Sequence, residues 1–259
     1  MSTFLFDKII FGPVNSRRLG ISLGINLLPT DLKVCNFNCV YCECGLTSKN
    51  SQQHQRFYTR EEIASALAAR LASASNEYEV LDSITFAGNG EPTLHPDFPM
   101  IIEDTIELRD FYYPETKITV LSNATTLKKD YVADALQKVD NIILKLDSGN
   151  ERTIKLINSP LFDFYISDLV TNLKKFEGKL IIQTLFLKGF INGQVIDNTS
   201  DDEVLEWIKL LKIINPKLVM IYTFARNTPS PDLEKASLQR MNEICEMVNK
   251  EGINGEVFD

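Results

Sequence analysis

The sequence lacks any run of about 18 apolar residues, and this absence excludes a transmembrane helix. It also lacks a secretory signal, since the opening residues MSTFLFDKIIFG include a lysine and no small-residue cleavage site. Basic residues are in the minority, with 27 Lys and Arg against 35 Asp and Glu and a formal net charge of −8. This acidity disfavours a protein whose main task is to bind nucleic acid, although it leaves room for a local basic patch. We expect a globular, cytoplasmic protein without membrane contact.

Cysteines are few and unevenly placed: Cys35, Cys39, Cys42 and Cys44 fall within ten residues, and Cys245 lies near the far end. An odd number of cysteines without a secretory signal disfavours a disulfide framework. The spacing C-x3-C-x2-C provides three thiolates on one short loop. It predicts a [4Fe–4S] cluster with one iron free of protein ligands. Buried or reactive cysteines without a metal are the alternative.

A structural zinc site or a ferredoxin-type cluster would need a fourth protein ligand. Cys44 lies too close to Cys42 to be the fourth corner of the same cube. The distant candidates are Cys245, His54 and His95, and no second CxxC pair or HxxxH motif accompanies them. A site with three protein ligands therefore remains the favoured interpretation.

Apolar runs alternate with helical patterns along the chain, which predicts parallel βα units. We expect a single α/β domain over residues 1–259, a partial (β/α)6 TIM-type barrel with parallel strands. Residues 1–20 would form a leader and about 21–250 the barrel. The predicted strands cover 21–28, 83–88, 117–123, 141–147, 179–187 and 217–224. The predicted helices cover 60–75, 97–109, 128–137, 151–158, 165–176, 201–214 and 236–250.

Polar residues follow several of these strands, at the barrel end where parallel barrels carry their chemistry. After the second strand the chain reads Gly88-Asn89-Gly90-Glu91. Two glycines allow a tight turn that exposes the backbone to a ligand, and Glu91 adds a carboxylate. A simple glycine-rich βα turn is the alternative.

The cysteine spacing, with Tyr41 directly before the third cysteine, resembles the signature of the radical S-adenosylmethionine (SAM) superfamily. The resemblance implies that Cys35, Cys39 and Cys42 bind a [4Fe–4S] cluster whose fourth iron chelates SAM. Reductive cleavage of SAM would give a 5′-deoxyadenosyl radical that abstracts hydrogen from a substrate. It also implies a partial barrel and a cofactor contact from Tyr41.

The same resemblance assigns further cofactor contacts. Gly88, Gly90 and Glu91 match the superfamily element that contacts the amino group of SAM, and Asn89 would contribute main-chain contacts. The carboxylate and ribose of SAM would be bound by polar residues at later strand ends, namely Ser122, Asn123 and Asp147. Each of these could equally be a helix cap or a turn residue. Gln183 would face inward from the fifth strand.

The leader contains the segment GPVNSRRLG at 12–20 and the strand element SLGIN at 22–26. Both resemble a compact subgroup related to the wyosine-type tRNA-modifying enzymes. The paired Arg17 and Arg18 suit a phosphate or carboxylate, with solvated surface arginines as the alternative. No catalytic residue is identified, and the candidates are Cys44, Lys145, Arg17 and Arg18.

The favoured function is a radical SAM enzyme, an oxidoreductase in the broad sense, acting on a modified nucleoside, RNA or another small molecule. One alternative is an activating enzyme or peptide-modifying maturase acting on a protein partner. The alternative from another class is a non-catalytic iron–sulfur electron carrier. The expected partners are SAM, an unidentified substrate and an external electron donor such as flavodoxin or ferredoxin.

Overall fold

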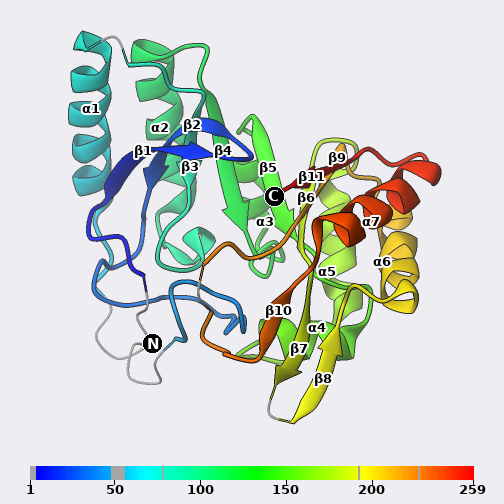
Figure 1. Cartoon of the computed structure of the whole chain (residues 1–259). Helices are drawn as coiled ribbons and strands as arrows, with labels where there is room; N and C mark the ends of the chain where they lie inside the picture. Colours follow the sequence, from blue (N-terminus) through cyan, green and yellow to red (C-terminus); the bar gives the residue numbers. More distant parts are fainter. Residues whose placement is uncertain (1–3, 48–55, 78, 192, 227) are drawn as a thin grey trace.

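The computed structural model describes residues 4–47, 56–77, 79–191, 193–226 and 228–259. Its main feature is a curled sheet of eight strands in the order β1-β2-β3-β4-β5-β6-β9-β11 (Figure 1). The strands from β2 onward are parallel, as predicted. They are β2 (Gly20–Ile25), β3 (Ser83–Phe86), β4 (Lys117–Ser122), β5 (Asn141–Lys145), β6 (Ile181–Leu185), β9 (Leu218–Tyr222) and β11 (Gly255–Phe258).

The sheet extends beyond both bounds expected for the barrel. β1 (Ile10–Ser16) lies in the expected leader and pairs antiparallel with β2. Its register shifts between Phe11 and Val14, where Gly12 and Pro13 interrupt the strand pattern in the sequence. At the other end, β11 adds a further parallel strand beside β9, beyond residue 250. The leader is therefore part of the sheet.

The helices agree closely with the predicted ranges, and α1 and α2 cover one side of the sheet in Figure 1. α1 starts at a capping box in which Thr59 and Glu62 satisfy each other's backbone amides. The helices are α1 (Arg60–Asn76), α2 (Phe98–Tyr112), α3 (Asp130–Leu136), α4 (Glu151–Asn158), α5 (Ile166–Leu173), α6 (Asp201–Ile214) and α7 (Leu238–Lys250), with short 3-10 turns η2 (Pro92–Leu94) and η3 (Lys174–Phe176). In the ranges listed above for the structure, every helix is too short or too polar to cross a bilayer.

A second, antiparallel sheet of three strands projects below the main sheet in Figure 1. It contains β7 (Leu187–Ile191), β8 (Gln194–Asp197) and β10 (Leu233–Lys235). β7 follows β6 with only Phe186 between them, so the predicted strand at 179–187 joins two structural elements in one run. Trp207 of α6 is buried and donates to the carbonyl oxygen of Leu146.

The turn between β1 and β2 reaches the inner face of the curl. Leu19 packs against a small buried cluster formed by Ile143 of β5, Ile181 of β6 and Met220 of β9. Because these strands lie on the far side of the sheet from β1 and β2, the turn spans the open interior. The fold thereby brings Arg18, the neighbour of Leu19, close to the strands that carry the candidate site.

Candidate active site

The cysteine loop leaves the carboxyl end of β2 and folds over the ends of the neighbouring strands. Cys35, Cys39 and Cys42 line one cavity of about 170 Å³, together with Cys44. Two isolated bridges hold the loop, one between Val34 and Gly90 and one between Phe37 and Pro160. The loop thus presents its thiols toward the strand ends, where the barrel fold was expected to place chemistry.

Three thiols of the cysteine loop share one cavity, and such a donor set suits an iron–sulfur cluster. Within the described ranges, no three His, Cys, Asp or Glu side chains converge as the ligands of one metal ion would. Three cysteines instead share a cavity, and thiolates are the ligands that iron–sulfur clusters take. The donor set therefore fits a [4Fe–4S] cluster.

The distant residues considered as a fourth ligand are engaged elsewhere. His95 is buried, with Nε2 at 2.8 Å from the carbonyl oxygen of Tyr58 and Nδ1 accepting from the amide of Asp97. Cys245 donates to the carbonyl oxygen of Gly255. His54 lies outside the described residues.

Cys44 lines the same cavity and lies 3.5 Å from the carbonyl oxygen of Gly88. Burial raises the pKa of the Cys35 thiol to about 12. The Cys44 thiol and the Lys33 ammonium lower the pKa of Cys42 despite its burial. Burial alone would lower the pKa of Lys33, but Cys42, Cys35 and Cys39 in thiolate form outweigh it and raise that pKa. Lys33 is a site residue that the sequence prediction missed; the available signal was a lysine two residues before the first cysteine.

The glycine motif after β3 packs directly against the cysteine loop. Gly88 and Gly90 have φ angles of 144° and 141°, and both line the cavity. The amide of Val34 donates to the carbonyl oxygen of Asn89, and the amide of Glu91 donates to the carbonyl oxygen of Val34. The two motifs that the sequence separates by more than forty residues therefore form one structural unit.

Asn89 differs from the prediction, which gave it main-chain contacts to the cofactor. Its main-chain amide already donates to Oδ1 of Asn26, and its main-chain carbonyl oxygen already accepts from the amide of Val34. Its buried side chain binds both backbone groups of Phe6 and the carbonyl oxygen of Pro29. Asn89 thus fastens the N-terminal segment beneath the cysteine loop, outside the cavity.

Glu91 lies in the cavity wall with its carboxylate held by protein donors. Oε1 accepts three hydrogen bonds: from the amide of Thr93 at 3.2 Å, from the hydroxyl of Thr93 at 2.5 Å and from the hydroxyl of Ser122 at 2.8 Å. Oε2 accepts only from the amide of Asn123, at 2.7 Å. Burial raises the pKa of Glu91, and these donors oppose that rise. Because Oε2 accepts a single hydrogen bond from the protein and Glu91 lines the cavity, Oε2 has room for a further donor.

Ser122 and Asn123 both line the cavity from the end of β4. The Ser122 hydroxyl donates the hydrogen bond to Oε1 of Glu91 described above. The side-chain amide of Asn123 donates to Oδ1 of Asn36 at 2.8 Å and lies 3.7 Å from Sγ of Cys35. Ser122 thus orients the carboxylate, and Asn123 contacts the first cysteine.

Asp147 also differs from the prediction, which gave it a direct contact to the SAM ribose. Its carboxylate is buried and is not part of the cavity wall. Oδ2 accepts from Tyr41 at 2.5 Å, Asn158 at 2.7 Å and Lys145 at 3.3 Å, and Oδ1 accepts from the amide of Leu185. Because the carboxylate is held by these protein donors and lies outside the cavity wall, Asp147 positions its neighbours.

Tyr41 and Lys145, which both donate to this buried carboxylate, do line the cavity. The Lys145 ammonium donates to the hydroxyl of Tyr41 and lies 4.9 Å from the centre of its ring. Burial would lower the pKa of Lys145, but the Asp147 carboxylate outweighs burial and the pKa is raised. Lys145 therefore lines the cavity as an ammonium group paired with the Asp147 carboxylate.

Gln183 lines the cavity from β6 and joins it to the β1–β2 turn. Its Oε1 accepts from Nη1 of Arg18 at 2.9 Å. The Arg18 guanidinium carbon lies 4.5 Å from the ring centre of Tyr222, a cation–π contact. Arg17 is exposed. Of the two arginines considered from the sequence, Arg18 is the one that reaches the site.

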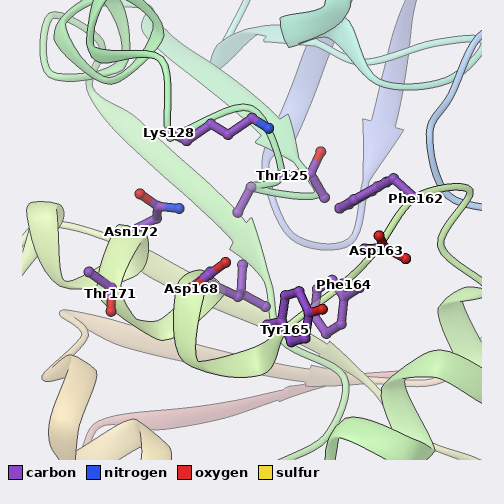
Figure 2. Close-up of a pocket in the computed structure, with 11 residues that line it drawn as sticks. Thr125, Lys128, Phe162, Asp163, Phe164, Tyr165, Asp168, Thr171 and Asn172 are labelled. Carbon is purple, nitrogen blue, oxygen red and sulfur yellow. The ribbon is translucent and has the colours of Figure 1, made fainter.

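A second cavity, of about 300 Å³, lies beside the site and was not predicted (Figure 2). Three segments line it, at 124–128, 162–165 and 168–172, with Phe162, Tyr165 and Lys128 drawn in Figure 2. Phe162 stacks on Phe37 of the cysteine loop at 6.1 Å between ring centres. Since Phe37 lines the first cavity, two aromatic rings separate the two spaces.

Comparison with known proteins points to the same chemistry. The family model of the radical SAM superfamily matches residues 32–192, which include the cysteine loop, the glycine motif and the ends of β4, β5 and β6. A UPF0026 protein of Synechocystis sp. is 34% identical over 78% of this chain and 71% of its own length. A protein of Brachyspira hyodysenteriae named GTPase Obg is 33% identical over 86% of this chain, which spans only 31% of that protein.

Another relative is named as an S-adenosylmethionine-dependent nucleotide dehydratase, from Flammeovirga pacifica. It is 28% identical over 71% of this chain and 62% of its own length. Among solved structures, a radical SAM methyltransferase from Sphaerobacter thermophilus has a TM-score of 0.68 and 17% identity, covering 91% of this chain and 65% of that one. The structure described as native anSMEcpe with bound AdoMet has a TM-score of 0.60 and 17% identity, covering 90% of this chain and 64% of that one.

The two structural similarities establish the fold, and the match to the family model covers the residues that build the cavity. The cofactors of the radical SAM superfamily are a [4Fe–4S] cluster and SAM. By this match the chain belongs to the radical SAM superfamily, within the UPF0026 group.

Proposed function

We propose that this protein is a radical SAM enzyme that modifies an anionic, nucleotide-type substrate in the cavity beneath the cysteine loop. The observation that carries the proposal is the common cavity lined by Cys35, Cys39, Cys42 and the Gly88–Glu91 motif. Cluster and SAM together supply the reductive cleavage that yields a 5′-deoxyadenosyl radical. The protein's own residues bind and orient these groups.

Glu91 is proposed to bind the amino group of SAM. The free acceptor position on Oε2 suits an ammonium donor, and the three contacts to Oε1 fix the direction of the carboxylate. Gly88 and Gly90 carry no side chain, so a ligand can approach the backbone closely there. Cys35, Cys39 and Cys42 are proposed as the cluster ligands, with Asn123 close to the first of them.

The substrate class is proposed from the charge of Arg18, which adjoins the cavity through Gln183. Lys145 also lines the cavity, but its charge is paired with Asp147. An arginine presents five N–H donors in a planar fork that matches phosphate or carboxylate oxygens. The dehydratase relative is named for a nucleotide, a molecule with such an anionic group. A small nucleotide is therefore favoured over a peptide partner.

The resemblance of residues 12–26 to the wyosine-type subgroup supports a nucleoside-type substrate as well. The net charge of −8 disfavours an RNA, because RNA binding relies on many phosphate contacts from Lys and Arg. We therefore propose a free nucleotide as the substrate, in preference to a tRNA. On this proposal Arg18 contacts the substrate, and the exposed Arg17 does not.

Reduction of the cluster requires an electron from another protein, for which we propose a flavodoxin or ferredoxin of the cytoplasm. All five cysteines have free thiols, which suits a reducing compartment. We further propose that residues 1–259 act as one core domain. β1 and β11, which form the two edges of the main sheet, support this proposal, because segments far apart in the sequence contribute strands to the same sheet.

The test is a comparison of nucleotides with the matching nucleosides. The protein, reconstituted anaerobically with iron and sulfide, is reduced with dithionite in the presence of SAM, and 5′-deoxyadenosine is quantified by mass spectrometry. We expect nucleoside 5′-phosphates to raise its rate of formation, and a deuterated nucleotide to transfer deuterium into it. Equal stimulation by nucleosides and their phosphates would contradict the anionic substrate class. Stimulation by peptides alone would contradict the nucleotide assignment.

A further inference from the structure

Lys33 places a buried positive charge at the cluster cavity. The residue is 4% exposed and lines the cavity with Cys35, Cys39 and Cys42. Its ammonium donates to the carbonyl oxygen of Gly45 at 2.8 Å. Among the residues that the structure describes, it forms no ion pair with an Asp or Glu, and the remaining residues of the chain include neither type.

Lys145, the other lysine of this cavity, is the useful contrast. Its ammonium lies 3.3 Å from the carboxylate of Asp147, so its charge is compensated within the protein. Burying an ammonium without an anionic partner is costly, and a lone backbone carbonyl does not neutralise it. Lys33 is the lysine of this cavity without such a partner among the described residues, and an anion bound in the cavity would lie beside it.

The groups that can supply this anion are the thiolates of the cysteine loop. Three thiolates outweigh the positive charge of an iron–sulfur core, so the bound cluster is an anion, and one-electron reduction adds a further negative charge. A fixed cation nearby stabilises the reduced form more than the oxidised form by Coulomb attraction, which is strongest where water is excluded. Net charge near the cluster is one of the factors that set its reduction potential.

We infer that Lys33 is the countercharge of the cluster and raises its reduction potential, which eases transfer of the electron from the donor. This inference rests on the proposed ligands Cys35, Cys39 and Cys42. The loop geometry keeps the charge in place, because the amide of Gly45 donates to the carbonyl oxygen of Cys42 at 2.9 Å. One tight turn thus carries both a cluster ligand and the acceptor that holds Lys33. On this inference Lys33 is a positioning residue: it holds a positive charge beside the cluster and takes no part in bond cleavage.

The experiment is a potentiometric titration of the reconstituted protein without SAM, followed by the electron paramagnetic resonance signal of the reduced cluster. The variants are Lys33→Met, which removes the charge, and Lys33→Arg, which keeps it. Lys138→Met is the matched control, because Lys138 lies on the surface with its side chain 48% exposed. Iron and sulfide are counted per chain, so that occupancy and potential are measured separately.

We expect Lys33→Met to lower the equilibrium constant for reduction at least tenfold, which corresponds to 59 mV for one electron. Lys33→Arg and Lys138→Met are expected to titrate close to the wild type. If Lys33→Met binds no cluster while Lys33→Arg does, the requirement for charge is upheld. A fully loaded Lys33→Met protein with the wild-type potential would overturn the inference, and so would loss of the cluster in both variants, since the Gly45 contact would then be what matters. A wild-type cluster that survives replacement of Cys35, Cys39 or Cys42 would instead contradict the proposed ligands.

Discussion

A Cβ atom added to Gly90 would lie 1.8 Å from the carbonyl oxygen of Val34. Gly90 therefore allows the glycine motif and the cysteine loop to touch, at a φ angle of 141° that disfavours any side chain. We expect Gly90→Ala to displace the loop and to abolish most of the cluster binding, measured as iron and sulfide per chain after reconstitution.

Gly252→Ala is the matched control for this prediction. Gly252 also has a positive φ, of 78°, but a Cβ atom there would meet nothing within 4 Å. The control is expected to cost about 1–2 kcal/mol of stability through backbone strain and to keep full cluster content. Equal cluster content in the two variants would show that contact between the motifs is not required.

Tyr41 is predicted to stabilise the fold through Asp147. Tyr41→Phe removes one donor from a buried carboxylate that keeps its bonds to Asn158 and Lys145. Loss of such a charge-assisted bond is expected to lower the free energy of unfolding by about 1–3 kcal/mol, measured by urea denaturation under anaerobic conditions. Tyr131→Phe, at a tyrosine that is 52% exposed, should change it by less than about 0.5 kcal/mol. A Tyr41→Phe protein as stable as this control would contradict the role assigned to the hydroxyl.

Arg18 is predicted to bind the anionic group of the substrate. Arg18→Met is expected to weaken binding of a nucleoside 5′-phosphate about tenfold, as measured by calorimetry, because a charge-assisted hydrogen bond is lost. Binding of SAM should be unaffected, since its proposed contacts come from Glu91 and the glycine motif. Arg17→Met, at the exposed neighbour, should bind the nucleotide as the wild type does. Equal losses in the two variants would point to a general charge effect.

His95 is predicted to make stability depend on pH. Burial lowers its pKa, and Nδ1 accepts a hydrogen bond from the amide of Asp97 that protonation would break. A group with a lowered folded-state pKa contributes stability that is present above its unfolded pKa, about 6.5, and is lost as the pH falls through the folded value. Between about pH 7.5 and about pH 5.5, the wild type should lose more of its free energy of unfolding than His95→Gln does in urea denaturation. Parallel losses in the two proteins would contradict this prediction.

Much of the fold follows from the sequence because apolar runs and helical patterns alternate clearly. The strands β2, β3, β4, β5, β6 and β9 and all of the helices lie close to their predicted ranges. β1 escapes prediction because Gly12 and Pro13 interrupt its pattern, and β7 because Phe186 leaves no polar break after β6. These strands depend on pairing partners that are distant in sequence or set by a tight turn.

The site was predicted less evenly, and the reason is competition for hydrogen bonds. The cysteines and glycines carry their function in spacing and backbone freedom, which a sequence displays directly. Asp147 and Asn89 have suitable chemistry, but Tyr41 and Asn158 in one case, and Phe6 and Pro29 in the other, occupy their polar groups. Those partners come from distant segments, so the sequence alone leaves open whether a ligand or the protein satisfies each side chain.

The measurement that tests the central claim most directly is SAM cleavage by cysteine variants. The reconstituted and reduced wild-type protein is expected to convert SAM to 5′-deoxyadenosine. Cys35→Ala, Cys39→Ala and Cys42→Ala should each lose both the cluster signal and the product, whereas Cys245→Ala, near Gly255, should keep both. A wild-type protein with an intact cluster that forms no 5′-deoxyadenosine, or any of the three loop variants that still forms it at the wild-type rate, would contradict the account.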